Sequence, residues 1–202
     1  MSPSHAARTA HAALGSLAAV AAALAATSAD AGVPGAISVS STVSNTALTN
    51  GRSLDINGDS VGDFTIVFFN SQVLRIDGVG TNATSDSNVS TGFAVDYTLA
   101  IPSNQTISSS TAWAVTTALA SLGSTGPGTD YYAGIRFLIG ANTHYGWVRF
   151  NIPQVSGWAG ATAVSAAWQT TPNLAIAAGA VPAPGAVAVL IGAGLVGRRR
   201  RT

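Results

Sequence analysis

The central part of this chain consists of short β-forming runs and has no sustained helical period. Between Gly32 and Ala180 these runs are broken at short intervals by Gly, Asn, Ser and Pro. This pattern predicts strands joined by turns. The chain also lacks Glu and Lys, two residues that surface helices favour. We therefore predict an all-β fold, with a single β-sandwich (jelly-roll-like) body over residues 32–180.

Seven runs within this body are predicted as strands: Ala36–Val43, Asp63–Asn70, Gln72–Asp77, Gly92–Ile101, Tyr131–Ile139, His144–Ile152 and Thr162–Thr170. One stretch differs. Thr111–Leu122 has apolar residues at 112, 115, 118, 119 and 122, a spacing that predicts a short helix or turn.

The segment from Tyr131 to Ile152 predicts a β-hairpin, because the polar connection Gly140–Thr143 separates two strong strands. Alternation along the second strand divides its side chains between two faces. Tyr145, Trp147 and Arg149 share one face, and His144, Gly146, Val148 and Phe150 share the other. One face must form the core, and large rings occur on both.

The two ends of the chain have a different composition from the body. Residues 1–31 combine Arg8, the apolar run Ala12–Ala26 and Ala29-Asp30-Ala31, which is typical of a signal peptide cleaved by signal peptidase after Ala31. Beyond this point the body carries four arginines and seven aspartates, a net charge of −3. A body of this charge has no basic face for nucleic acid. The absence of Cys excludes disulfides.

The C-terminal segment, residues 181–202, has three parts in order: Val181-Pro182-Ala183-Pro184, the apolar run Gly185–Gly197, and the four arginines Arg198, Arg199, Arg200 and Arg201. The run is shorter than the ~20 residues that a membrane-spanning helix needs. By the positive-inside rule the arginines hold its end at the cytoplasmic side. We predict transient insertion of a short hydrophobic helix into the inner membrane; the alternative is a permanent single-span transmembrane anchor.

This arrangement resembles the PEP-CTERM sorting signal of Gram-negative bacteria, with Ala183 in place of the family's usual Glu. The end of the body adds to the resemblance through His144-Tyr145-Gly146-Trp147, Thr171-Pro172 and Ile176–Gly179, so that the likeness covers residues 131–202. The resemblance implies a β-sandwich surface domain. It also implies that an exosortase removes the tail near the Pro motif and that the protein reaches the cell surface or the extracellular matrix.

A cluster of oxygen-bearing side chains precedes the second predicted strand. Asp55, Asn57, Asp59 and Asp63 occupy positions 1, 3, 5 and 9 of a segment that resembles D-x-[DN]-x-D-G calcium loops. Ser60 stands at position 6, where such loops have Gly. A calcium site is one interpretation. The other is an Asx-rich turn in which these side chains cap their own backbone.

The remaining candidate catalytic residues do not indicate an enzyme. His144 is the single histidine after position 31 and lies within an aromatic run, and we predict no catalytic activity. Six rings are candidates for a sugar-stacking platform, although core packing is the favoured interpretation: Tyr131, Tyr132, Tyr145, Trp147, Trp158 and Trp168.

Two functions follow from these patterns. The first is an exported cell-surface or matrix protein with a structural or adhesive role and no cofactor. The alternative is a calcium-assisted carbohydrate-binding module of the exopolysaccharide matrix, with Ca²⁺ held by the Asp55–Asp63 loop.

Overall fold

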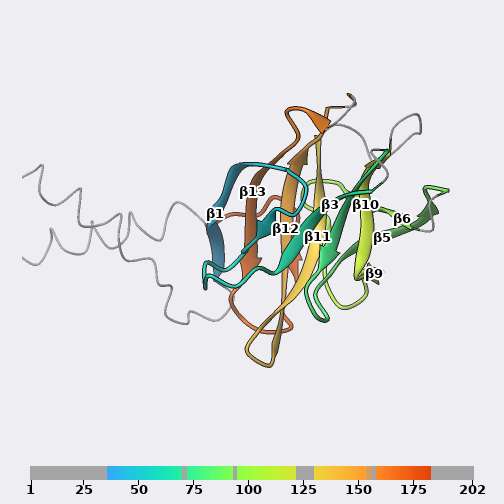
Figure 1. Cartoon of the computed structure of the whole chain (residues 1–202). Helices are drawn as coiled ribbons and strands as arrows, with labels where there is room; N and C mark the ends of the chain where they lie inside the picture. Colours follow the sequence, from blue (N-terminus) through green and yellow to red (C-terminus); the bar gives the residue numbers. More distant parts are fainter. Residues whose placement is uncertain are drawn as a thin grey trace, which may run out of the picture. The chain divides into compact units, whose positions relative to one another are not determined.

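The described part of the chain folds into strands and turns (Figure 1). The computed structural model describes residues 36–69, 72–92, 95–121, 130–153, 155 and 158–182, and no α-helix occurs among them. The predicted signal peptide lies outside the described residues, as does the apolar run of the C-terminal tail. The strands are β1 (Ile37–Ala47), β2 (Ser53–Leu54), β3 (Phe64–Phe69), β4 (Val73–Gly78), β5 (Ala83–Ser90), β6 (Asp96–Thr98), β7 (Ala100–Ile101), β8 (Thr106–Ile107), β9 (Trp113–Ala114), β10 (Thr116–Ser121), β11 (Asp130–Ile139), β12 (Asn142–Asn151), β13 (Thr162–Gln169) and β14 (Ile176–Ala177).

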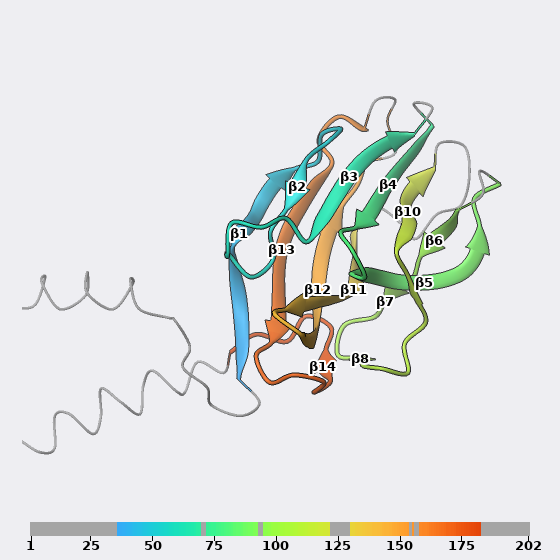
Figure 2. The same ribbon diagram turned by 60° about the horizontal axis from the view of Figure 1, so that its bottom comes forward.

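Twelve of these strands form one continuous sheet that curls into a nearly closed barrel (Figure 2). Its order is β1-β13-β12-β11-β5-β6-β10-β4-β3-β2, with β7 beside β11 and β9 beside β5. The two ends of this path approach each other where the Thr42 hydroxyl donates to the carbonyl oxygen of Asp55. The all-β prediction is confirmed. The prediction of a sandwich is not confirmed, because one hydrogen-bonded path joins all the strands of the barrel.

Strands occur in the described parts of all seven predicted runs, although Gly92–Ile101 contains two short strands, β6 and β7. The helix or turn predicted over Thr111–Leu122 is wrong. Its described part forms β9 and β10, and β10 lies inside the sheet, antiparallel to β4 and parallel to β6. A central strand is covered on both faces, so Ala118, Leu119 and Ala120 are all fully buried. Their apolar run therefore reflects two-sided burial and not one face of a helix.

The β11–β12 hairpin is confirmed, with a tighter turn than predicted. Ile139 pairs with Asn142, which leaves Gly140 and Ala141 as a two-residue turn, and Gly140 has a φ of 61°. Two-residue turns with positive φ match the twist of antiparallel strands. The register therefore places Tyr132 opposite Arg149 and Arg136 opposite Tyr145.

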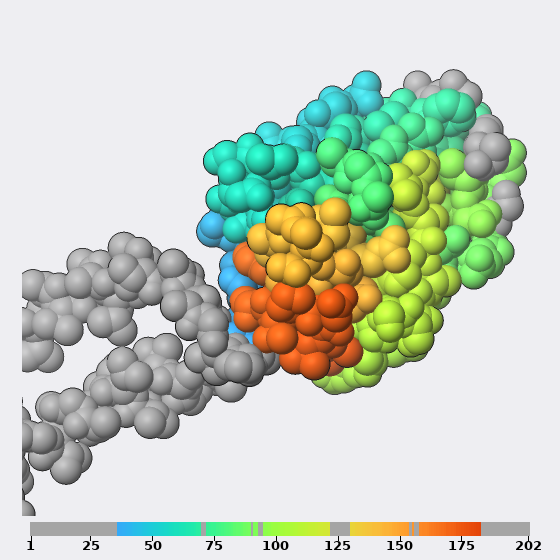
Figure 3. All heavy atoms as spheres, turned by 90° about the horizontal axis from the view of Figure 1, so that it is seen from below, coloured from blue at the N-terminus to red at the C-terminus, as the bar shows by residue number. Residues whose placement is uncertain are grey.

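Both faces of this hairpin are core. One face contributes Ile135, Phe137 and Phe150 to the main cluster inside the barrel. The opposite face contributes Trp147 and Tyr145 to a second cluster, which is covered by residues from β7, β8 and β14. In Figure 3 the red-orange segment that ends the described body lies beside the gold tip of the hairpin. The second layer explains why large rings occur on both faces.

Candidate functional site

The Asp55–Asp63 loop is a series of side-chain caps on its own backbone. The Asp55 carboxylate accepts hydrogen bonds from the N–H groups of Gly58, at 2.7 Å, and Ser60, at 2.9 Å. Asn57 Oδ1 accepts from the N–H of Asp59, and Asp59 Oδ1 accepts from the N–H of Val61. These are Asx-turn contacts. The four predicted calcium ligands thus lie in one loop. In the described part of the chain, however, no group of three or more acidic or His side chains is arranged to hold a metal.

Asp63 is the buried member of this loop. It is 5% exposed, and its Oδ2 accepts a hydrogen bond from the N–H of Ile56 at 2.8 Å. Its Oδ1 lies 3.4 Å from the Asn82 amide nitrogen. Burial raises the pKa of the Asp63 carboxyl from 3.8 to about 6; the Ile56 hydrogen bond opposes this rise, and the negative charges of Asp59 and Asp55 add to it.

This raised pKa predicts that the fold becomes more stable as the pH falls from about 7 to about 4. The folded protein binds the Asp63 proton more tightly than the unfolded chain. The stabilisation is therefore complete below 3.8 and is lost as the pH rises through about 6. We expect a gain of about 2 kcal/mol in the free energy of unfolding. Urea unfolding at the two pH values measures it.

The Asp63→Asn variant is the control for this prediction. Its amide oxygen is able to accept the Ile56 N–H bond, and it does not titrate. The gain on acidification should disappear in this variant. An equal gain in wild type and variant would show that another group causes the pH dependence.

The six candidate rings divide into five that are core and one that reaches the surface. Tyr131, Tyr145, Trp147, Trp158 and Trp168 are all buried. Tyr132, which points to the outer face of β11, is half-buried. The core interpretation is therefore right for five rings. His144 is also buried and its Nδ1 lies 2.8 Å from the carbonyl oxygen of Gln169, as expected for a packed residue.

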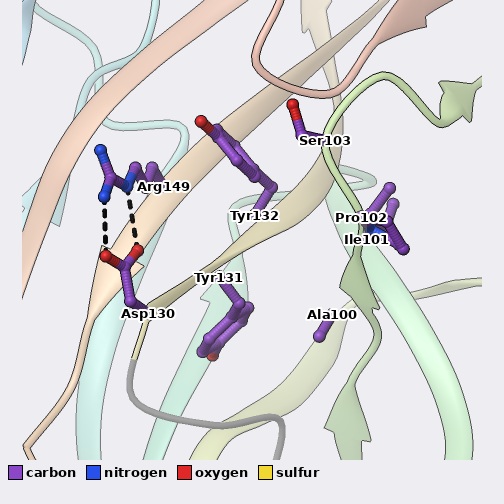
Figure 4. A pocket seen from close by; sticks show the side chains of 8 residues that line it. All are labelled: Ala100, Ile101, Pro102, Ser103, Asp130, Tyr131, Tyr132 and Arg149. Carbon is purple, nitrogen blue, oxygen red and sulfur yellow. Dashed lines mark hydrogen bonds and ion pairs between the residues drawn. The ribbon is translucent and has the colours of Figure 1, made fainter.

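Tyr132 lies in a groove of about 560 Å³, which we call the Tyr132 groove. It is shown in Figure 4 and is lined by Ala100, Ile101, Pro102, Ser103, Asp130, Tyr131, Tyr132 and Arg149. The start of β11 supplies the tyrosine, and the segment that follows β7 forms the opposite wall. The Tyr131 ring turns away from the groove, and its hydroxyl donates to the carbonyl oxygen of Leu119.

A bidentate ion pair borders the Tyr132 groove. Arg149 donates from Nε to Asp130 Oδ1 at 2.9 Å and from Nη2 to Oδ2 at 2.7 Å. This pair lowers the pKa of the Asp130 carboxyl and raises the pKa of the Arg149 guanidinium. The Arg149 side chain is 40% exposed and the Asp130 side chain is 42% exposed. No pattern in the sequence predicted this pair.

The described body ends at the predicted sorting motif. Val181 is 55% exposed and Pro182 is exposed, and neither belongs to a strand. Ala183, Pro184 and the four arginines Arg198, Arg199, Arg200 and Arg201 lie outside the described residues. Within the described ranges, no helix has the length and apolar character to cross a membrane.

Comparisons with protein-family models, with curated proteins and with solved structures gave no match to this chain.

Proposed function

We propose that this chain is an exported cell-surface or matrix protein of a Gram-negative bacterium, with a structural or adhesive role. An exosortase sorts it through the tail at residues 181–202. The proposal takes the body to be a surface domain of the jelly-roll-like class. Its sequence support is the signal-like segment at one end and the Pro, apolar and Arg parts at the other.

One observation supports this proposal most directly. The last residues of the body are hydrogen-bonded to the fold, whereas the start of the Pro motif that follows them is exposed to solvent. Strand β14 pairs with β8, and the indole Nε1 of Trp147 donates to the carbonyl oxygen of Ala180 at 3.0 Å. Val181 and Pro182 follow at once and are exposed. A peptidase that cuts near the Pro motif therefore has access to the chain and leaves the folded body intact.

Intact-mass analysis tests this proposal. The protein is recovered separately from cells and from culture matrix, in strains with and without the sorting peptidase. We expect a mature form that starts at Gly32 and ends near Pro182, and that is absent without the peptidase. A form that retains Arg198–Arg201 and sediments with membranes would instead indicate a permanent anchor.

A second candidate function is calcium-assisted carbohydrate binding. The half-buried ring and polar border of the Tyr132 groove favour the carbohydrate part. For the calcium part, a bound cation would favour the Asp63 carboxylate over its protonated form and would reduce the pH dependence described above. Thermal melting of the wild type with and without millimolar calcium tests it directly. Identical melting curves would contradict a calcium site in the loop.

A further inference from the structure

The Tyr132 groove has the dimensions and the lining of a small-molecule site. Its volume of about 560 Å³ lies within the range of ~300–1,000 Å³ that is usual for such sites. Figure 4 shows Tyr132 between the Asp130–Arg149 pair on one side and Ser103 on the other. The groove therefore places one aromatic ring between polar groups.

The Tyr132 ring is held in position before any ligand binds. The Trp147 ring meets it edge-on, with centroids 5.3 Å apart. Gly179 lies against the hydroxyl end of the ring, where a Cβ at this glycine would be 3.2 Å from both Tyr132 Cζ and the hydroxyl oxygen. A ring that is fixed in this way loses little conformational entropy when a ligand stacks on it.

The ion pair supplies fixed hydrogen-bonding groups at the border of the groove. Two N–H groups of Arg149 are used by Asp130, and a guanidinium has five such donors. Each carboxylate oxygen of Asp130 accepts one bond from Arg149 and has a second lone pair for another donor. The pair thus offers donors and acceptors side by side, which matches adjacent hydroxyl groups of a sugar.

The charge of the border favours an uncharged ligand. Asp130 and Arg149 neutralise each other, and among the described residues no other Asp or Arg lines the groove. An exposed ion pair of this kind contributes little to stability. The Asp130–Arg149 pair is therefore available for ligand binding, because the stability of the fold depends little on it.

We propose that the Tyr132 groove binds a neutral pyranose oligosaccharide, with one sugar ring stacked on Tyr132 and its hydroxyls bonded to Asp130, Arg149 and Ser103. Aromatic rings stack on the apolar C–H faces of sugars, and the polar pair sets the orientation. This inference rests on the carbohydrate part of the second candidate function alone and locates the site away from the Asp55–Asp63 loop. It does not require calcium.

Calorimetric titration of the purified full-length chain tests the proposal, with cellohexaose and β-1,4-galactohexaose as neutral probes and a hexagalacturonate as the acidic probe. We expect at least one neutral probe to bind, and the acidic probe to bind more weakly. Tyr132→Ala should weaken binding at least tenfold, and Tyr132→Phe should retain most of it. The double variant Asp130→Asn with Arg149→Gln should also weaken binding at least tenfold.

A matched control comes from the other ion pair of the body. Arg75 Nη2 donates to Asp77 Oδ2 at 2.7 Å, and neither residue lines the Tyr132 groove. The double variant Arg75→Gln with Asp77→Asn should bind as the wild type does. Loss of binding in this control, or wild-type binding by Tyr132→Ala, would overturn the location of the site. Failure of both neutral probes to bind the wild type would overturn the sugar proposal, while the sorting proposal is decided separately by intact mass.

Discussion

Replacement of Gly78 by Ala is expected to destabilise the fold by about 3 kcal/mol or more. Gly78 ends β4, and a Cβ at this position would lie 1.9 Å from the carbonyl oxygen of Asn82 and 2.5 Å from its carbonyl carbon. Both atoms belong to the backbone, so no rotation of a side chain relieves the clash. The turn between β4 and β5 would have to move.

This movement would also disturb a buried hydrogen-bonding residue. The Asn82 amide nitrogen donates to the carbonyl oxygen of Asp63 at 3.1 Å, and its Oδ1 accepts from the N–H of Leu138 at 3.1 Å. Asn82 therefore joins the start of β3 to the end of β11. A shift of its backbone leaves these buried polar groups poorly paired, which adds to the cost.

Urea unfolding of Gly78→Ala measures the effect, with Gly80→Ala as the control in the same turn. Gly80 has a φ of 66° and open space around its Cβ position, so its replacement introduces backbone strain alone. We expect a cost of about 1–2 kcal/mol for Gly80→Ala. A Gly78→Ala variant no less stable than the Gly80→Ala variant would contradict the close approach of the two backbones.

Strand positions were predictable where side chains alternate or form apolar runs, and the polar strand β5 was missed. β5 has the sequence ATSDSNVS and contains one exposed Val as its largest apolar residue. Its Thr84 is nevertheless fully buried and lies 2.7 Å from the hydroxyl of Thr117, which lies 2.6 Å from that of Thr98. Buried hydroxyls that bond to one another remove the cost of burial. Such pairing depends on strands that are distant in sequence.

The Asp130–Arg149 pair was missed because of a difference in the hairpin turn. A four-residue connection at Gly140–Thr143 would pair Ile139 with His144 and place Arg149 opposite Gly134. The observed two-residue turn moves the register and brings Arg149 opposite Tyr132, which lies two residues from Asp130 along β11 and on the same face of the strand. The shift keeps every side chain on its predicted face, since the face repeats every two residues. The predicted faces were therefore correct, whereas the cross-strand neighbours that a four-residue turn implies differ from those observed.

The Asp55–Asp63 loop shows why a ligand pattern alone does not define a site. Calcium loops and Asx turns use the same residue types, because in both the side-chain oxygens face the inside of a tight turn. Here those oxygens accept N–H groups of the loop. The calcium interpretation remains a prediction, and the melting experiment with calcium decides it.

The second large effect is expected at Trp147, which links the hairpin to the end of the body. It is 3% exposed, contacts the Tyr132 ring and donates to the carbonyl oxygen of Ala180. Trp147→Ala should lower the free energy of unfolding by about 3–5 kcal/mol, because it removes a large ring from the second cluster. Urea unfolding measures this loss.

Trp147→Phe separates the hydrogen bond from the packing. It retains an aromatic ring and removes the donor to Ala180, at a cost of about 1 kcal/mol for the bond. Because this bond secures the segment after β14, hydrogen exchange at the Ala178 amide, which donates to the carbonyl oxygen of Gln105 at 2.9 Å, should accelerate.

Trp158→Phe is the matched control, since Trp158 is 2% exposed and its indole nitrogen has no hydrogen-bond partner in the described part of the chain. Its replacement by Phe alters packing but removes no hydrogen bond. The altered packing lies in the main cluster, to which Trp158 belongs, and not beside β14. Exchange at Ala178 should therefore stay as in the wild type. If Trp147→Phe also left this exchange unchanged, pairing of β14 with β8 would be sufficient to secure the end of the body. The exposed position of Val181 and Pro182 would then depend on that two-residue pairing and not on the indole.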